Sequence, residues 1–362
     1  MQGGMKSKIA LIKKEPFFLS IGIFLLILLL SLLWTDIDNI KFGIKYIKRY
    51  WYLLPMFTIY TSLNKKFIPI TLSAFLSGMF ISELISYSIF FEFIHIKGIN
   101  HLSPSPFMQY TLYSVFLVLT TGIALNRMLT SESIKFKIIY GILFITTTVN
   151  LFINPGRTGQ FIFIFILASV LIGHYKATLK SLLFTLSLLF IIPYLAFTYN
   201  PIFKLRMTHA YNNSVNNHSS ETSVGVRIAL NIVAKDIFLE NPIIGVGVGD
   251  YLIKKNEILS QKYPNKIRAK ELVHYHNQYS EFAVIAGLFG LLSYIFILIS
   301  LIKTKITDQR IYTTKYILVI TIALSSFTDA IFHLNQPLSL FALFAGLIVA
   351  QSRYEQEETN LK

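Results

Sequence analysis

The residues best suited to chemistry stand at the start of a long apolar segment. His276 and Asn277 open the run HNQYSEFAVIAGLFGLL, which is apolar enough to begin a membrane span. An imidazole beside hydrocarbon is expensive to keep there, and it exchanges a proton near neutral pH. The position therefore predicts chemistry at a membrane surface. His276 is the first candidate, and the nearby His274 is its substitute.

Two arginines stand in contexts that suit anion binding. Arg157 lies in the turn NPGRTG, where Pro and Gly set the bend and the amides of the following helix can face an anion. Arg227 lies at the start of a segment, Val226 to Glu240, whose apolar residues recur at helical spacing and which Asn241-Pro242 ends. The structural alternatives are a snorkelling side chain for Arg157 and a solvated helix face for Arg227.

Other polar residues are weaker candidates. Gly245, Gly247 and Gly249 have the spacing of a nucleotide loop, but no βαβ strand precedes them and no P-loop lysine follows, so a close-packed turn is expected. Asp250 is a candidate second acid or base. Glu83 lies within a predicted span, as does Asp329, and each is either functional or a hydrogen-bond partner between helices. The histidines show no metal-binding spacing such as HExxH, so no metal site is predicted.

The composition is that of a membrane protein. The chain has 362 residues, of which 54% are hydrophobic and only 14% charged, values outside the usual range of soluble domains. The net charge of +15 therefore does not indicate nucleic acid until the basic residues are placed relative to the spans. Cysteine is absent, which excludes disulfides and thiolate metal sites.

Hydropathy predicts an all-α polytopic protein with about 10–12 transmembrane helices, since a span needs about 20 apolar residues. Three regions follow: an N-terminal transmembrane bundle of about seven spans at 1–198, a large loop with short helices at 199–277, and C-terminal transmembrane helices with a tail at 278–362. The first apolar run lacks a cleavage site and is expected to stay in the protein. The candidate spans lie near 16–34, 49–63, 67–93, 107–126, 136–153, 160–173, 180–198, 278–302, 315–332 and 337–351.

The distribution of basic residues predicts the orientation. With the N-terminus inside, 17 lysines and arginines fall on the cytoplasmic side and 6 in short external loops, as the positive-inside rule requires. The remaining 10 lie in the long loop, which the rule does not count. Both termini are therefore expected in the cytoplasm, and the long loop, Arg157 and His276 on the external face.

Three motifs together resemble a known family. They are the HNQY run with its AGLFG helix, the segment NPIIGVGVGDY that ends at Tyr251, and the RTG that begins at Arg157. The chain is similar over roughly residues 150–292 to the bacterial O-antigen ligase and polymerase superfamily. The resemblance implies a membrane glycosyltransferase of the bacterial inner membrane, with a periplasmic active site and an undecaprenyl-diphosphate-linked polysaccharide as donor.

The resemblance also implies roles for the candidate residues. His276 would be the general base that deprotonates the acceptor hydroxyl, and Arg157 and Arg227 would bind the diphosphate. Asn277, Tyr279, Glu281, Asp250 and His274 would support the site or contact sugars. Glu281 is expected to orient His276 from one turn further on, or to be a hydrogen-bonded carboxylate at a helix start. No cofactor and no metal are expected.

Ligase chemistry is favoured over its alternatives. A ligase would transfer the polysaccharide to lipid A-core, with inversion at the anomeric carbon. One long external loop with HNQY late in a compact chain is similar to the ligase pattern. The O-antigen polymerase uses the same donor and remains an alternative, as does a ligase that glycosylates protein. A flippase or transporter is less favoured, because it predicts repeat symmetry and broken mid-membrane helices.

Overall fold

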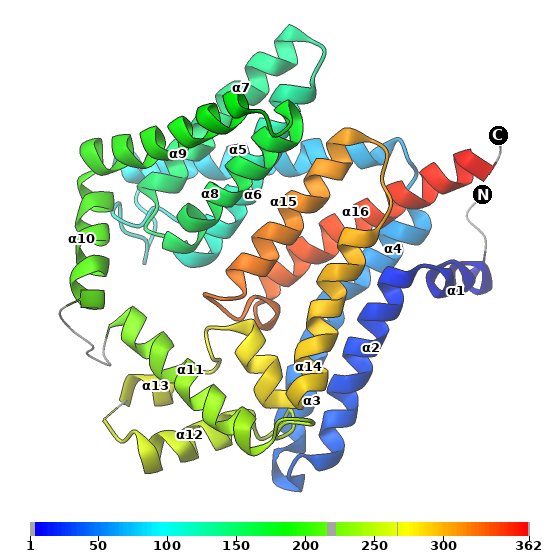
Figure 1. Cartoon of the computed structure of the whole chain (residues 1–362), viewed down its shortest axis with the longest axis vertical. Helices are drawn as coiled ribbons and strands as arrows, with labels where there is room; N and C mark the ends of the chain where they lie inside the picture. The colour runs from blue at the N-terminus through cyan, green and yellow to red at the C-terminus, as the bar shows by residue number, and fades with distance from the viewer. Residues whose placement is uncertain (1–3, 216–221, 266, 361–362) are drawn as a thin grey trace. The chain divides into compact units, whose positions relative to one another are not determined.

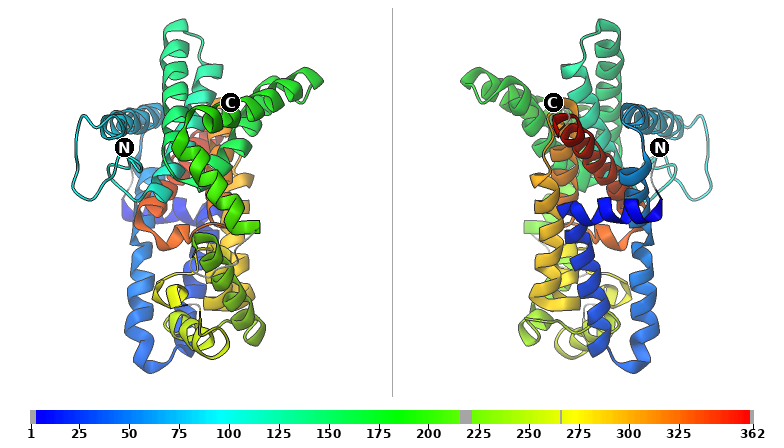
Figure 2. Two further views of the ribbon diagram at one scale, coloured as in Figure 1. Left: turned by 90° about the vertical axis from the view of Figure 1, so that its left-hand side faces the viewer. Right: turned by 90° about the vertical axis from the view of Figure 1, so that its right-hand side faces the viewer.

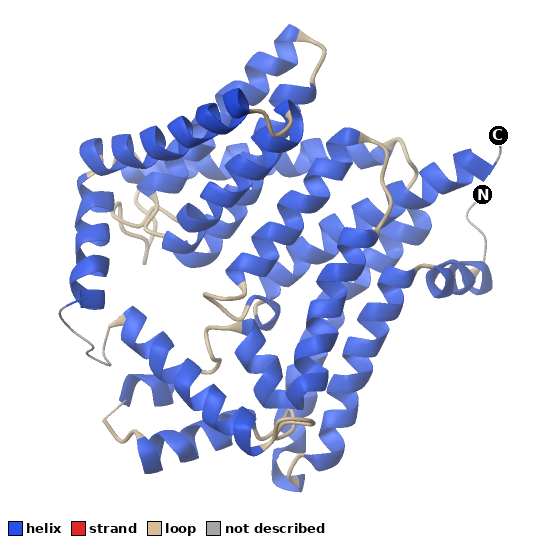
Figure 3. Ribbon diagram, viewed as in Figure 1, coloured by secondary structure: helices blue, strands red, loops and turns tan. Residues whose placement is uncertain are grey.

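The computed structural model describes residues 4–215, 222–265 and 267–360, and every regular element in them is a helix (Figure 3). Eight of the described helices are long and apolar enough to cross a membrane, which confirms the all-α polytopic class. These are Pro16–Trp34, Phe67–Phe90, Tyr110–Thr130, Ile134–Ile153, Arg157–Tyr175, Leu179–Tyr199, Gln278–Lys303 and Asn335–Asn360.

Eight is two fewer than the ten candidate spans located in the sequence, and two predicted segments account for the difference. The segment 49–63 is divided into the 3₁₀ helix η3 (Arg49–Leu53) and the short α4 (Leu54–Ser62). The segment 315–332 belongs partly to α15 (Gln309–Ser325), which ends before the polar residues that follow Ser325. Hydropathy gives no sign of the first interruption, whereas α15 ends where the polar run Ser325-Ser326-Phe327-Thr328-Asp329 begins.

The contacts divide the chain into two compact units. The first contains residues 1–62, 210–305 and 326–350, and the second contains 63–209, 306–325 and 351–362. This division follows contacts in space and crosses the three regions drawn from the sequence.

The first unit is built around α2 and α14, which lie side by side (Figure 1). Phe24 of α2 packs edge-on against Phe282 of α14 and against Phe332. The helices α11, α12 and α13 pack together, and α11 and α12 pack against α14 (Figure 2). The unit contains α1 (Met5–Lys14), α2 (Pro16–Leu30), η1 (Ser31–Trp34), η2 (Ile37–Asn39), α3 (Ile40–Lys48), η3, α4, α11 (Ser223–Glu240), α12 (Tyr251–Lys262), α13 (Ile267–Glu271), α14 (Gln278–Lys303), η4 (Ile331–His333) and most of α16 (Asn335–Asn360).

The second unit is built around α6, which is buried along most of its length. α6 packs against α7, α8 and α15. Gly122 permits this close packing, because a Cβ at that position would stand 2.6 Å from Ile166 of α8 and 2.9 Å from Ile317 of α15. The unit contains α5 (Phe67–Phe90), α6 (Tyr110–Thr130), α7 (Ile134–Ile153), α8 (Arg157–Tyr175), α9 (Leu179–Tyr199), most of α10 (Pro201–Val215) and α15.

Candidate active site

Two histidines face one carboxylate immediately before α14. The Nδ1 atom of His276 lies 3.2 Å from Oδ1 of Asp329, and the Nδ1 atom of His274 lies 3.7 Å from the same oxygen. The two imidazole rings are 4.1 Å apart. Asp329 is buried, and the amide of Ala330 donates to its Oδ1 at 2.9 Å. A carboxylate at a turn between two helices is thus held against both rings.

The hydrogen bonds assign different roles to the two rings. The backbone amide of His276 donates to Nδ1 of His274 at 3.2 Å, so that nitrogen carries no proton. Asp329 is therefore left to pair with the Nδ1–H of His276, which makes Nε2 of His276 the basic nitrogen. The 3.2 Å separation is within ion-pair distance, but the alignment falls short of a hydrogen bond. Such contacts often tighten only when substrate binds.

The electrostatics disfavour a positive charge on His274. Burial, followed by the neighbouring charge of His276, lowers the pKa of His274 to about 4. Burial raises the pKa of Asp329, but the nearby ring of His276, followed by that of His274 and the amide of Ala330, outweighs burial and holds that pKa below its ordinary value. At neutral pH the nearest partner of His276 is therefore an anion, with a neutral imidazole on its other side.

The backbone of His276 is in the left-handed region, with φ at +50°. This conformation is uncommon for residues other than glycine and costs roughly 1–3 kcal/mol. Asn277 follows in an extended conformation and caps α14, accepting from the amide of Ser280 at 3.2 Å. The sharp change in direction sets the ring of His276 apart from the helix, and such strain is frequently found at functional sites.

Glu281 contacts a different histidine from the one expected. Its Oε1 lies 2.9 Å from Nδ1 of His333 and accepts from the hydroxyl of Tyr46 at 2.8 Å. Its Oε2 accepts from the amide of Tyr275 at 3.2 Å. The prediction that Glu281 orients His276 is therefore wrong, because the helix directs this carboxylate to η4 and α3. Glu281 is completely buried, so all of these contacts are shielded from water.

One further expectation from the sequence is corrected. Asp329 was expected inside a span but lies in the turn between α15 and η4, where it reaches the histidines. His274, the substitute candidate, faces the same carboxylate as His276, because the left-handed backbone at His276 turns the two rings to one side. The sequence signal for Asp329 and His333 was only that ionisable residues stood near apolar segments.

The start of α14 is joined firmly to the turn that carries Asp329. The amide of Gln278 donates to the carbonyl of Ser326 at 2.8 Å, and its side-chain Oε1 accepts from the amide of Phe332 at 2.6 Å. Tyr279, a predicted supporting residue, packs on Phe327 with 4.5 Å between ring centroids.

The helix α11 connects the same two segments. Arg227 donates through Nε to the carbonyl of Thr328 at 3.1 Å, next to Asp329 in the chain. Asn231, one turn later, accepts from Nδ2 of Asn277 at 2.8 Å and from the hydroxyl of Ser280 at 2.7 Å. The side chain of Asn277, predicted to contact sugar, is thus engaged in capping and in this contact. The contact with Thr328 places Arg227 near Asp329, and Arg227 and His276 lie in the same unit.

The loop that contains Gly245 and Gly247 lies against a break in α14. At Ala286 and Gly287 the helical dihedrals are interrupted, and α14 changes direction (Figure 1). The amides of Val246 and Gly247 donate to the carbonyls of Val284 and Ile285, both at 2.9 Å. These carbonyls precede the break and lack their helical partners. The loop therefore satisfies the broken helix, consistent with the close-packed turn expected.

Both carboxylate oxygens of Asp250 accept hydrogen bonds that hold the local fold. Its Oδ2 accepts from the amide of Asp36 at 2.8 Å and its Oδ1 from Nδ2 of Asn39 at 2.6 Å. Both oxygens are used to hold the turn before α3. These contacts give Asp250 no described link to the histidines, and its role as a second acid or base rests on the resemblance alone.

A buried lysine holds the segment that leads to His274. Lys255 of α12 has no exposed surface, and its Nζ donates to the carbonyls of Ala269 (3.1 Å), Lys270 (3.3 Å) and Leu272. Burial lowers the pKa of Lys255 to about 8. The hydroxyl of Tyr275 also donates to the carbonyl of Tyr251 at 2.9 Å. The segment before the histidines is therefore fixed to α12 by side chains that sequence patterns do not reveal.

The second unit contains Arg157 and Glu83. Arg157 is the first residue of α8, and Gly156 is its N-cap, so the guanidinium stands at the positive end of a helix dipole. Glu83 of α5 accepts from the hydroxyl of Thr146 of α7 at 2.8 Å. Glu83 therefore forms a hydrogen bond between two helices, which was the structural alternative to a functional role for this residue.

His274, His276 and Asp329 are also the residues in the described part of the chain that could hold a metal ion. Their ligand atoms lie within 4.8 Å of one another. Tetrahedral zinc with bonds of about 2.0–2.1 Å needs ligand atoms closer together, about 3.3 Å apart. The present spacing suits an imidazole–carboxylate pair better than a preformed zinc site. A search for ligand spacing in the sequence does not find this cluster, because Asp329 is distant in the chain from His274 and His276.

These features define a class: a helical membrane protein of several spans that holds a histidine–carboxylate centre at the start of a broken helix. Residues 142–295 match the family model described as O-Antigen ligase. This match supports membership of the O-antigen ligase and polymerase superfamily, which implies a membrane glycosyltransferase-like enzyme with lipid-linked polysaccharide as substrate. The match includes Arg157, Arg227 and His276 but ends before Asp329 and His333. The search of curated proteins found no match.

Proposed function

We propose that the protein is an O-antigen ligase. It transfers polysaccharide from undecaprenyl diphosphate to a sugar of lipid A-core on the periplasmic face of the bacterial inner membrane. The transfer proceeds without metal and inverts the anomeric carbon. The observation that carries the proposal is the pairing of His276 with Asp329 inside a chain of this superfamily.

The proposed reaction is one displacement. Nε2 of His276 removes the proton from the acceptor hydroxyl, and Asp329 stabilises the imidazolium that forms. The acceptor oxygen bonds to the anomeric carbon as the bond from that carbon to the diphosphate oxygen breaks. The diphosphate leaves with the electron pair. Attack opposite the leaving group inverts the carbon.

Arginine side chains are the proposed partners of the leaving diphosphate. Arg227 donates through Nε to the carbonyl of Thr328, and its two terminal nitrogens present further donors in a planar fork. Arg157 is the second proposed contact. Charge that develops on the diphosphate as the bond breaks is stabilised by such fixed donors. Diphosphate is already a good leaving group, so the reaction requires no nucleotide.

The test is transfer in liposomes that contain the full-length protein, undecaprenyl diphosphate-linked polysaccharide and lipid A-core. His276→Ala and Asp329→Asn should each lower the transfer rate by about 100-fold or more, the usual contribution of a general base. His174→Ala, which removes an exposed histidine at the end of α8, is the matched control. EDTA should leave wild-type transfer unchanged. Full activity of His276→Ala would remove the general base from the proposal.

The acceptor separates the ligase from the polymerase. A ligase should transfer glycan to lipid A-core and should not extend a second lipid-linked repeat. In a deletion strain, lipopolysaccharide should lose all polysaccharide caps, while lipid-linked polymer accumulates. Caps of a single repeat in that strain would instead assign the protein as a polymerase.

A further inference from the structure

The basic residues predicted in short external loops are concentrated at α3. Four of these six lysines and arginines are Lys41, Lys45, Lys48 and Arg49. No acidic residue occurs from Asn39 to Ser82. Within the described part of the chain, none of the four cations forms an ion pair with a carboxylate. The cluster is therefore an uncompensated positive charge on the side of the membrane where the positive-inside rule predicts few cations.

Three of these cations share one exposed face of α3. Lys41, Lys45 and Lys48 are separated by four and by three residues, which places them on one side of a helix. All three side chains are exposed. Gly43 and Tyr46 are the buried residues of α3 and lie on its other side. The lysine face, defined as Lys41, Lys45 and Lys48, thus points away from the rest of the first unit.

The buried side of α3 is fixed against the segments that form the candidate site. A Cβ on Gly43 would stand 3.0 Å from a side chain of the glycine-containing loop before α12, so the two backbones approach closely. The hydroxyl of Tyr46 donates to Oε1 of Glu281 at 2.8 Å. The other oxygen of Glu281 accepts from the amide of Tyr275, the residue before His276. A ligand on the lysine face is therefore bound to an element that one carboxylate connects to the histidine segment.

The residues after the lysine face indicate its depth in a bilayer. α3, η3 and α4 follow one another without an intervening loop. Trp51 and Tyr52 of η3 come directly after the cations, and the side chain of Trp51 is 69% exposed. Tryptophan and tyrosine are enriched where headgroups meet hydrocarbon, and α4 contains no charged residue. The order of cations, aromatic rings and uncharged helix places the lysine face at the level of the lipid headgroups.

We infer that the lysine face of α3 binds phosphate groups of the acceptor, lipid A-core. Lipid A is a phosphorylated glycolipid, so its phosphates lie at the headgroup level. Lysine binds phosphate as a point charge. The three lysines are spread over about 10 Å of helix, which suits a ligand with more than one phosphate better than a single phosphodiester. The inference rests on the proposed function for the identity of the acceptor and on the predicted orientation.

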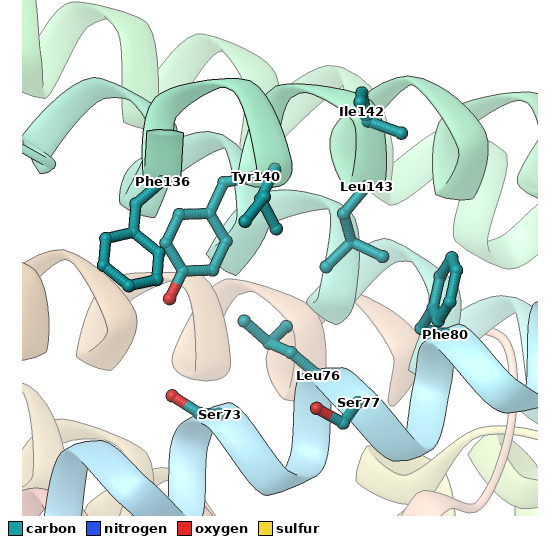
Figure 4. A pocket seen from close by; sticks show the side chains of 9 residues that line it. Ser73, Leu76, Ser77, Phe80, Phe136, Tyr140, Ile142 and Leu143 are labelled. Atoms are coloured by element: carbon teal, nitrogen blue, oxygen red, sulfur yellow. The ribbon is translucent and has the colours of Figure 1, made fainter. Parts of the chain in front are cut away.

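An apolar pocket in the second unit provides a contrast. It lies between α5 and α7, with a volume of about 430 Å³ and with Leu76, Phe80 and Leu143 in its wall (Figure 4). Its wall contains no lysine or arginine. The pocket therefore offers apolar surface to an acyl chain but no cation to a phosphate. Ser77→Trp fills this pocket and is the control for effects of lipid packing alone.

The experiment measures binding of fluorescent lipid A-core to the full-length protein in nanodiscs of phosphatidylcholine. Competitors are intact lipid A-core and chemically dephosphorylated lipid A-core. The double variant Lys41→Gln with Lys45→Gln should bind intact lipid A-core about 25-fold more weakly, or about fivefold for each lysine. It should bind the dephosphorylated lipid like the wild type. A double variant that retains the full preference of the wild type for the intact lipid would overturn the inference.

The controls separate this effect from loss of charge in general. Lys97→Gln with Lys204→Gln removes two exposed lysines that are also predicted on the external side. This variant and Ser77→Trp should each change binding of intact lipid A-core less than about twofold. Equal losses in the two double variants would overturn the inference, because any external lysine would then serve.

Phosphatidylglycerol tests whether the lysine face selects a phosphorylated glycolipid. Intact lipid A-core should displace the probe at least about tenfold better than phosphatidylglycerol does, because it presents phosphates to more than one lysine. Equal displacement by the two lipids would overturn the inference, since the face would then bind any anionic lipid at the membrane surface.

Failure of this inference can be told apart from failure of the proposed function, because binding of the acceptor requires no transfer. In the transfer assay, Lys41→Gln with Lys45→Gln should raise the half-saturating concentration of acceptor about 25-fold and leave that of donor unchanged. If the wild type binds lipid A-core through these lysines but transfers no glycan, the proposed function fails and the lysine face stands. If transfer is normal and the double variant keeps the wild-type preference, the inference fails alone. Melting temperatures of all variants identify any that misfold.

Discussion

At the scale of single residues, the site depends on which carboxylate each histidine meets. His276 is adjacent to Asp329, and His333 is adjacent to Glu281, although Glu281 is much nearer to His276 in sequence. Each pair brings together segments on either side of α15. Buried imidazole–carboxylate pairs keep one charge compensated and so avoid the cost of an isolated buried ion.

Replacement of arginine by lysine tests bidentate binding of the diphosphate. Arg227→Lys and Arg157→Lys keep the charge but lose the planar fork, and each should lower the transfer rate about 100-fold, or about 2.7–4 kcal/mol. The measurement is the transfer rate in liposomes, with Arg310→Lys as the control at an exposed site. Near-normal transfer by both variants would return Arg157 to the snorkelling alternative and Arg227 to a structural contact with Thr328.

The buried His274 predicts loss of stability in acid. Its pKa is about 4 in the fold and 6.5 ordinarily, so between these values the unfolded chain binds a proton that the folded chain does not. Stability should therefore fall as pH decreases from 6.5 to 4, by up to about 3 kcal/mol. The groups that face His274 are His276, Asp329, Glu281 and His333.

The measurement is the melting temperature of the purified protein in detergent across this pH range. His274→Asn retains a hydrogen-bonding side chain but does not titrate, so its melting temperature should decrease less between pH 6.5 and 4 than that of the wild type. Parallel curves for the two proteins would show that His274 does not carry the acid sensitivity.

At the scale of elements, the break in α14 creates the contact that holds the glycine-containing loop. The break at Ala286 and Gly287 frees carbonyls that the loop at 242–247 then satisfies, and this contact fixes the loop that leads into α12. α12 in turn holds the segment before His274 through Lys255. The glycine-rich motif and the AGLFG motif therefore contact each other in the fold.

Gly287→Ala tests this contact. The residue has φ at +59°, and an added Cβ would meet the carbonyl of Ile243. The left-handed backbone alone costs roughly 1–2 kcal/mol for an L-residue, and the clash adds to it, so the melting temperature should fall clearly. Gly22→Ala in α2 is the control, because no atom lies within 4 Å of its added Cβ. Equal melting temperatures for Gly287→Ala and wild type would contradict the assigned contact.

At the scale of the whole molecule, the charge distribution predicts how the chain is oriented in the membrane. The absence of cysteine makes this directly measurable. Asn212→Cys in the exposed part of α10 should react with a membrane-impermeant maleimide in cells with a permeabilised outer membrane. Gln356→Cys in the exposed end of α16 should react only after the inner membrane is lysed. The reverse pattern would invert the topology and exclude a periplasmic site.

The sequence by itself determined the fold class and supplied the candidate site residues. Continuous apolar runs predicted most spans, and Asn241-Pro242 correctly predicted the end of α11. His276, Arg157 and Arg227 were recognisable because their neighbours in the chain formed motifs. These are local properties, since helix formation and capping depend on residues within a few positions.

Only the tertiary structure decided which groups meet. Asp329 was mistaken for a residue within a span, and Glu281 was assigned to the wrong histidine, because pairing depends on how distant segments pack. The left-handed backbone at His276 and the break at Gly287 were equally hidden, since the residue types along the chain do not fix these dihedral angles. Contacts between segments far apart in the chain stabilise these conformations. Such contacts cannot be inferred from the residues that are neighbours along the chain.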